Sequence, residues 1–377
     1  MEFEQFLRSE PEPLKQYRLK HFASMKTARM PDTRYGLSIR IQPPFDVTRI
    51  EPSEAHGEFT ASKQQGVDIH VQPSPDMLKP FLDDSWIRNP HYVTHLNQAF
   101  TNHTVFIQID GVIAQPIVLH TLMKGSPFIQ KICIHAKIGS SATVFLEKKS
   151  VGMHSGYTAD IIQILTEPGS TMRCVTAQHV QPGVAVVQQR MSQSMKESSV
   201  EWIDLCLGGS YVRSEVNTTL LGEGASARNT ILFLAADTQL FDLYTESRHV
   251  APRTFSQILT KGVVNHHAKV LSRGLIRIEE NAYGSDGYEK QDTLLLSDEA
   301  EADAIPNLEI HNHDVKCSHG STVGQVDKEK LFYLMSRGLS RKEAERTIVE
   351  GYFTPVLEYL GDARKHVEKQ LLERLRA

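Results

Sequence analysis

The sequence predicts a mainly β protein whose strands lie between two helical regions. Strand-like segments of about five residues recur roughly every ten residues between positions 71 and 310. The first 70 residues are polar and contain several prolines, and the residues after Asp327 follow a helical pattern instead. We therefore expect an N-terminal helical or irregular region over 1–70, a β core over 71–322 and a C-terminal helical domain over 323–377.

The N-terminal region contains one clear helix signal. Proline is favoured in the first turn of a helix, and Pro13 stands before a helical pattern. Its apolar members form a rather broad face: Leu14, Tyr17, Leu19, Phe22 and Met25.

Short alternating segments define the β core. The clearest are 104–109, 131–135, 142–146, 212–221 and 229–234. Few tight two-residue turns of the kind that join antiparallel strands are present. Small and charged residues recur loosely instead, as in 220–227 and 279–286, which suits a solenoid whose coils bury their inward faces against each other. The pattern alone fits a sandwich or a cupin-like barrel equally well.

The C-terminal domain has good helix boundaries. Asp327 can cap a first helix that ends near Gly338. Ser340 and Glu343 form the pattern of a capping box for a second helix. The apolar members of that helix are Ala344, Ile348, Tyr352, Val356 and Leu360. After Gly361 a charged, amphipathic helix is expected over 362–376. We expect the apolar faces of these C-terminal helices to pack on the β core and any exposed apolar remainder to form a docking surface.

Composition narrows the classes of function. A net charge of −4 and a pI near 6.5 give the chain no overall attraction to nucleic acid or to anionic membranes. No apolar run is long enough for a transmembrane helix, and the first five residues lack a signal-peptide pattern. We expect a cytoplasmic protein that binds neither nucleic acid nor membrane.

The four cysteines are far apart in the sequence and form no Cys-x-x-Cys pair: Cys133, Cys174, Cys206 and Cys317. This spacing predicts neither a disulfide framework nor a self-contained metal motif. Cys206 lies in the strand-like segment 202–206, where a buried structural cysteine is favoured over a role in sulfur transfer.

Cys317 and His319 are the candidate metal ligands. Alternate residues of a strand share one face, and the two Cα atoms would lie about 7 Å apart. Thiolate and imidazole both suit iron, but two ligands do not complete a site, so the others must come from His311, His313 and Asp314 nearby or from a partner chain. An inert buried cysteine beside a merely hydrogen-bonded histidine is the competing interpretation.

Several blocks of the sequence resemble the SufB/SufD family of iron-sulfur cluster assembly scaffolds. The most specific are 308–310, 314–322, 331–334 and 336–338, and the blocks from His249 to Gly262 and over 292–296 are also similar. The resemblance implies a right-handed parallel β-helix flanked by N-terminal and C-terminal helical regions.

The segment Cys317-Ser-His-Gly320 is similar to the D-type branch of that family. B-type members usually carry Glu-His-Glu at positions 318–320 and a cysteine where this chain has Gln291. A SufD-like chain is therefore implied, and a single scaffold that forms homodimers stays open.

The family implies a scaffold rather than an enzyme. A nascent iron-sulfur cluster would form at the interface with a SufB-type chain or a second copy, through strands near 290–322, with Cys317 and His319 as ligands. A SufC-type ABC ATPase would dock on the C-terminal helical domain, and a sulfur donor would act upstream. The chain itself has no Gly-x-x-x-x-Gly-Lys-[Ser/Thr] motif, so we do not expect it to hydrolyse ATP.

Two other classes remain possible from the sequence. A cupin-like metal-dependent enzyme would use His311, His313 and His319 with a carboxylate. A non-catalytic interaction module would leave Cys317 inert.

Overall fold

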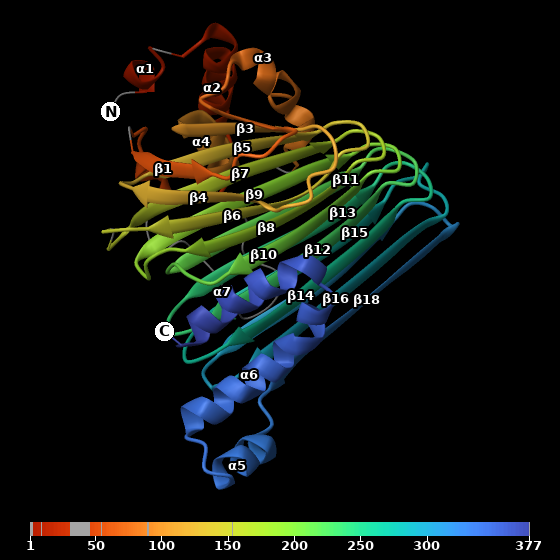
Figure 1. Cartoon of the computed structure of the whole chain (residues 1–377). Helices are drawn as coiled ribbons and strands as arrows, with labels where there is room; N and C mark the ends of the chain where they lie inside the picture. The colour runs from red at the N-terminus through yellow and green to blue at the C-terminus, as the bar shows by residue number, and fades with distance from the viewer. Residues whose placement is uncertain are drawn as a thin grey trace.

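The computed structural model describes residues 3–8, 10–30, 46–53, 55–88, 90–152 and 154–376. Part of the predicted N-terminal region, residues 31–45, lies outside the described residues. Two nine-stranded sheets form the body of the molecule (Figure 1). Sheet A contains, in order, β1 (His56–Ala61), β4 (Ile117–Lys124), β6 (Ser141–Ser150), β8 (Thr171–His179), β10 (Ser199–Cys206), β12 (Ser226–Ala235), β14 (Phe255–Val264), β16 (Ser285–Leu295) and β18 (Val315–Gln325). Sheet B contains β17 (Glu301–Ile310), β15 (Lys269–Ile278), β13 (Leu240–His249), β11 (Tyr211–Leu220), β9 (Val184–Ser194), β7 (Gly156–Thr166), β5 (Phe128–Ala136), β3 (His103–Ile109) and β2 (Val67–Val71).

From β3 onward, consecutive strands alternate between the two sheets, and each pairs in parallel with the next strand but one. The chain therefore winds as a solenoid, and the predicted parallel β-solenoid is confirmed. Neither an antiparallel sandwich nor a cupin-like barrel has this connectivity. The five strand-like segments all fall in strands, with only Leu221 beyond the end of β11.

The inside of the solenoid is packed with large side chains and also holds ionic groups. Phe233 of β12 is fully buried and lies against Gly262 of β14, where a Cβ atom would come within 2.2 Å of the ring. Arg190 and Asp204 form a buried ion pair of 2.6 Å in the same interior. Because burying such a pair is costly unless its other atoms are hydrogen-bonded, the 3.0 Å bond from Arg190 to the Ser214 hydroxyl helps to stabilise it.

The two ends of the solenoid differ. At the N-terminal end, β1 pairs antiparallel with β4, and β2 pairs antiparallel with β3. At the other end, β17 and β18 are edge strands, and most of their residues are partly or fully exposed. Strands β1 and β2 thus join the sheets although they lie at the end of the predicted 1–70 region.

Short helices cover sheet B near the N-terminus. They are α1 (Phe3–Phe6), α2 (Glu12–Met25), α3 (Pro75–Leu78) and α4 (Tyr92–Phe100), with single turns η1 (Val47–Arg49), η2 (Lys79–Phe81) and η3 (Asp84–Trp86). Helix α2 has its proline in the first turn, as predicted. Its buried side differs from the predicted apolar face, because Leu19 is exposed while Arg18 is buried and donates to the carbonyl oxygen of Ala99.

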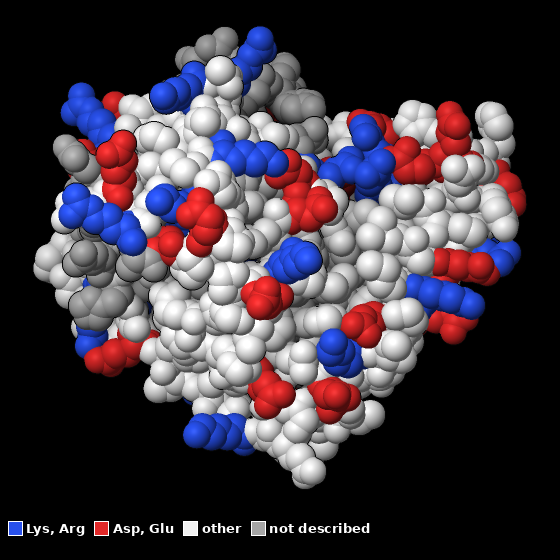
Figure 2. Space-filling view, turned by 90° about the horizontal axis from the view of Figure 1, so that it is seen from above, with Lys and Arg blue, Asp and Glu red and all other residues white. Residues whose placement is uncertain are grey.

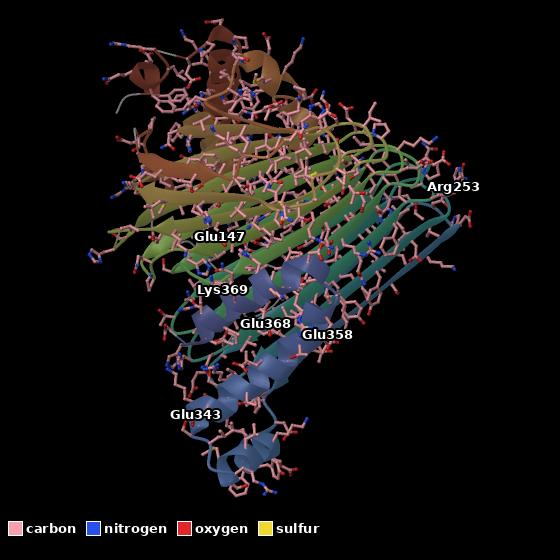
Figure 3. The ribbon with its side chains drawn as sticks, in the orientation of Figure 1. Glu147, Arg253, Glu343, Glu358, Glu368 and Lys369 are labelled. Carbon is pink, nitrogen blue, oxygen red and sulfur yellow. The ribbon has the colours of Figure 1, made fainter. Side chains whose placement is uncertain are left out.

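The C-terminal helices are α5 (Lys328–Ser336), α6 (Arg341–Glu358) and α7 (Arg364–Arg376), with the turn η4 (Gly361–Ala363) before α7. Both predicted caps are present. The Asp327 carboxylate accepts from the backbone amides of Glu329 and Lys330, and Ser340 and Glu343 form a capping box at the start of α6 (Figure 3).

Helices α6 and α7 lie across the outer face of sheet A (Figure 1). Of the apolar face predicted for this helix, Ala344, Val356 and Leu360 are buried, and Ile348 and Tyr352 are partly buried. Val349 and Phe353, which were not predicted, are buried as well. Helix α7 is held by polar contacts as well, because His366 lies 2.9 Å from the Glu147 carboxylate of β6 (Figure 3). Among the described residues, no helix is both long and apolar enough to span a bilayer.

Candidate functional site

Cys317 lies on edge strand β18 and points into the last coils of the solenoid. With Val315 it packs against buried Ile258 and Ile276. Its Cα pairs with that of Gly287 on β16, where a Cβ atom would lie 3.3 Å from the Cys317 sulfur. The absence of a side chain at Gly287 therefore makes room for the thiol.

The surroundings of Cys317 keep its thiol protonated. Burial raises the pKa of Cys317 to about 11, and the negative charges of Asp286 and Glu289 add to the shift. A thiol with this pKa is neutral at pH 7 and becomes a ligand only when a cation or a change of surroundings stabilises the thiolate.

His319 lies two residues further along β18, on the same face as Cys317 by strand alternation. It pairs in register with Glu289 of β16 and is exposed. The two sequence-predicted ligands are therefore neighbours at the open end of the solenoid, one partly buried and one free to reach a partner or an ion.

Glu289 was missed by the sequence reasoning. Its side chain is 0% exposed, and its Oε1 atom accepts a 2.6 Å hydrogen bond from Gln291. The other oxygen, Oε2, has no hydrogen-bond partner among the described residues. Burial raises the pKa of Glu289 to about 7. Alternation along β16 could have placed it on the same inward face as Gly287 and Gln291.

The remaining candidate ligands do not join this pair. His311 and His313 are exposed in the turn between β17 and β18. Within the described part of the chain, no three side chains of His, Cys, Asp or Glu converge closely enough to hold a metal ion. The cupin-like arrangement of His311, His313 and His319 is therefore not formed here.

Cys206 is fully buried in the solenoid, with its sulfur 3.5 Å from the Asp204 carboxylate. Burial, with the Asp204 charge as a smaller cause, raises the pKa of Cys206 well above the usual value for a thiol. A protonated, enclosed thiol is a poor nucleophile, which favours the structural role.

His249 belongs to a block that carried the family resemblance, and it is also internal. One ring nitrogen lies 2.7 Å from the Thr254 hydroxyl and the other 2.7 Å from that of Ser256. The block therefore forms a hydrogen-bonded part of the core rather than a surface site.

A second feature lies on the C-terminal helices. Phe332 and Tyr333 of α5 are 72% and 56% exposed, although aromatic side chains are usually buried. A groove of about 820 Å³ runs beside them between α5, α6 and the ends of β16 and β18, and is lined by Leu294, Asp327, Tyr333, Ile348 and Tyr352.

Surface charge is mixed. Figure 2 shows basic and acidic side chains interspersed on the face seen from above, without a large area of one sign. The described residues of this face form no basic surface that would attract the phosphates of nucleic acid.

The candidate ligands lie in a region of the chain that matches a known protein family. Residues 120–352 match the family described as SUF system FeS cluster assembly, SufBD core domain. The matched region runs from β4 into α6 and includes Cys317, His319 and Glu289.

Curated relatives give the same description. An iron-sulfur cluster assembly SufBD family protein of Staphylococcus aureus (strain USA300) is 30% identical over 227 residues, which are 60% of this chain and 47% of the relative. One of Staphylococcus epidermidis (strain ATCC 12228 / FDA PCI 1200) is 32% identical over 200 residues, 53% of this chain and 43% of the relative. The chain thus spans about half the length of the curated relatives it matches.

Proposed function

The chain belongs to the SufBD family of iron-sulfur cluster assembly proteins, and we propose that it is a scaffold subunit on which a nascent cluster is built. The observation that carries this proposal is the position of Cys317 and His319. They lie on the last strand of the family's core domain, at the open end of the solenoid, where iron and sulfide can reach them.

The scaffold needs a second chain to complete its site. Iron-sulfur clusters are commonly held by four protein ligands, and within the described part of the chain no three candidate ligands converge at this end. Strands β17 and β18 are the sheet edges there, their residues are partly or fully exposed, and an edge strand has backbone groups available for pairing with another chain. A SufB-type chain, or a second copy of this one, would cover these strands and supply the remaining ligands at the interface.

The exposed aromatic residues of α5 and the groove beside them support docking of a SufC-type ABC ATPase on the C-terminal helices. Helix α6 packs on sheet A, and Leu294 of β16 and Val326 after β18 belong to the same apolar cluster as Phe353. A movement of the helices driven by ATP would therefore be transmitted to the strands that carry the ligands. The chain would hold the cluster and leave ATP hydrolysis to its partner.

The proposal is tested by anaerobic reconstitution with iron and a sulfide source, followed by iron and sulfide analysis. Each assay uses this chain alone, with a SufB-type chain, and with both that chain and a SufC-type ATPase. We expect the largest cluster yield in the complete mixture and association of two β-solenoids in solution. A chain that stays monomeric in every mixture and binds neither iron nor sulfide would refute the scaffold role.

A further inference from the structure

Glu289 is a buried acidic side chain beside the two proposed ligands that the scaffold role does not yet use. It lies on the inward face of β16, in register with His319 and two residues from Gly287, the partner of Cys317. Its Oε2 atom has no hydrogen-bond partner among the described residues. Burying a carboxyl oxygen without a hydrogen-bond partner destabilises the folded state. Its position beside a thiol and an imidazole therefore suggests a functional role for Glu289.

Two glycines create the space that Glu289 and Cys317 occupy. A Cβ atom at Gly274, on β15 of the opposite sheet, would lie 1.6 Å from Glu289 Oε1. At Gly287, a Cβ atom would lie 2.9 Å from the Ile276 Cγ2 atom and 3.3 Å from the Cys317 sulfur. Because both positions lack a side chain, there is room for the Glu289 carboxyl group and the Cys317 thiol, which occupy neighbouring spaces inside the last coils.

The charges at this place favour a cation. A carboxylate and a thiolate are both anionic donors, and Glu289 lies two residues from Gly287, the Cα partner of Cys317. One cation between the two groups would neutralise both at once. The same ion would give the free Oε2 atom a partner.

We infer that Glu289 is a third ligand from this chain, an oxygen donor for the iron that Cys317 and His319 bind; the inference rests on the proposed function. Ferrous iron accepts carboxylate oxygen together with imidazole nitrogen and thiolate sulfur. The three side chains do not converge in the structure, so binding requires the exposed His319 to turn inward and the Glu289 side chain to rotate toward β18.

The experiment measures binding of ferrous iron to the full chain by anaerobic equilibrium dialysis. Glu289→Gln keeps the shape of the side chain but removes its charge, and Glu289→Met removes its polarity as well. Cys317→Ser serves as the reference for loss of a proposed ligand. Glu280→Gln is the matched control, because it removes an exposed carboxylate near the same end of the solenoid.

We expect Glu289→Gln and Glu289→Met to weaken iron binding at least tenfold, with Glu280→Gln unchanged and thermal unfolding of both Glu289 variants no earlier than that of the wild type. The methionine variant keeps the test valid if the glutamine variant does not fold. If Cys317→Ser loses iron while both Glu289 variants bind it as the wild type does, the inference is wrong and the scaffold role stands. If the wild type and Cys317→Ser bind equally little iron, the proposed ligand set itself fails.

Discussion

Gly262 is the position where a single added methyl group should be most informative about the solenoid core. It belongs to a sequence block shared with the family, yet it lies in the interior rather than at the candidate site. Phe233, one coil earlier, places its ring directly against it, and a Cβ atom at 262 would lie 2.2 to 2.3 Å from three ring atoms. Normal contact between carbon atoms needs about 3.5 to 4 Å.

The substitution Gly262→Ala must therefore move the ring or the backbone by more than an ångström. Phe233 is 0% exposed and fully enclosed, so it cannot move toward solvent. Overpacking of this kind costs about 1 to 3 kcal/mol, and the enclosed ring places Gly262→Ala near the upper value. We expect the free energy of unfolding, measured by urea denaturation, to fall by about 3 kcal/mol.

Gly320→Ala on β18 is the matched control, because an added Cβ atom there meets nothing within 4 Å. That variant should change stability by less than about 0.5 kcal/mol. Combining Gly262→Ala with Phe233→Leu should restore part of the loss, since the smaller side chain frees the space. If Gly262→Ala is as stable as Gly320→Ala, the close packing of Phe233 on Gly262 is not a real constraint.

Three further predictions concern the ligands, the core and the helices. Cys317→Ser should sharply reduce cluster yield per folded molecule and keep the fold. If the cysteine only packs in the core, the variant should instead lose about 1 to 3 kcal/mol of stability with an unchanged yield. Thermal unfolding and iron content, measured on the same samples, distinguish the two outcomes. Burial lowers the pKa of His249 to about 4, so below pH 6.5 the unfolded chain binds more protons than the folded chain does. The free energy of unfolding should therefore fall by about 3 kcal/mol between pH 6.5 and 4. His249→Asn should flatten that part of a plot of unfolding free energy against pH, and an unchanged slope would contradict the assignment. Replacing Phe332 and Tyr333 together with serine should weaken binding of a SufC-type ATPase at least tenfold, as measured by calorimetry, without lowering the melting temperature, because both rings are exposed; undiminished binding would place the docking site elsewhere.

Features set by neighbouring residues were predictable from the sequence. The caps at Asp327 and Ser340 depend on groups two or three residues away, and both formed as expected. The strand segments were also found, because alternation is local. Each strand pairs with a strand that lies a whole coil away in the sequence. Alternation within one strand therefore did not distinguish a solenoid from a sandwich.

The candidate site shows the same limit. Cys317 and His319 could be named as candidates because their spacing puts them on one face of a strand. The Glu289 side chain fits inside the solenoid because Gly274 on the opposite sheet has no side chain, and no local sequence pattern connects these two residues. The predicted face of α6 omitted Val349 and Phe353 for a similar reason, since the surface of sheet A decides how much of the helix is covered.

The two ends of the solenoid have consequences for how copies of the chain would assemble. Strands β1 and β2 pair antiparallel at one end, so the parallel winding of the coils does not continue there. At the other end the edge strands are β17 and β18, which belong to the parallel winding. In the dimer proposed above, each copy would cover these two strands of the other, and neither copy would then present them to a third.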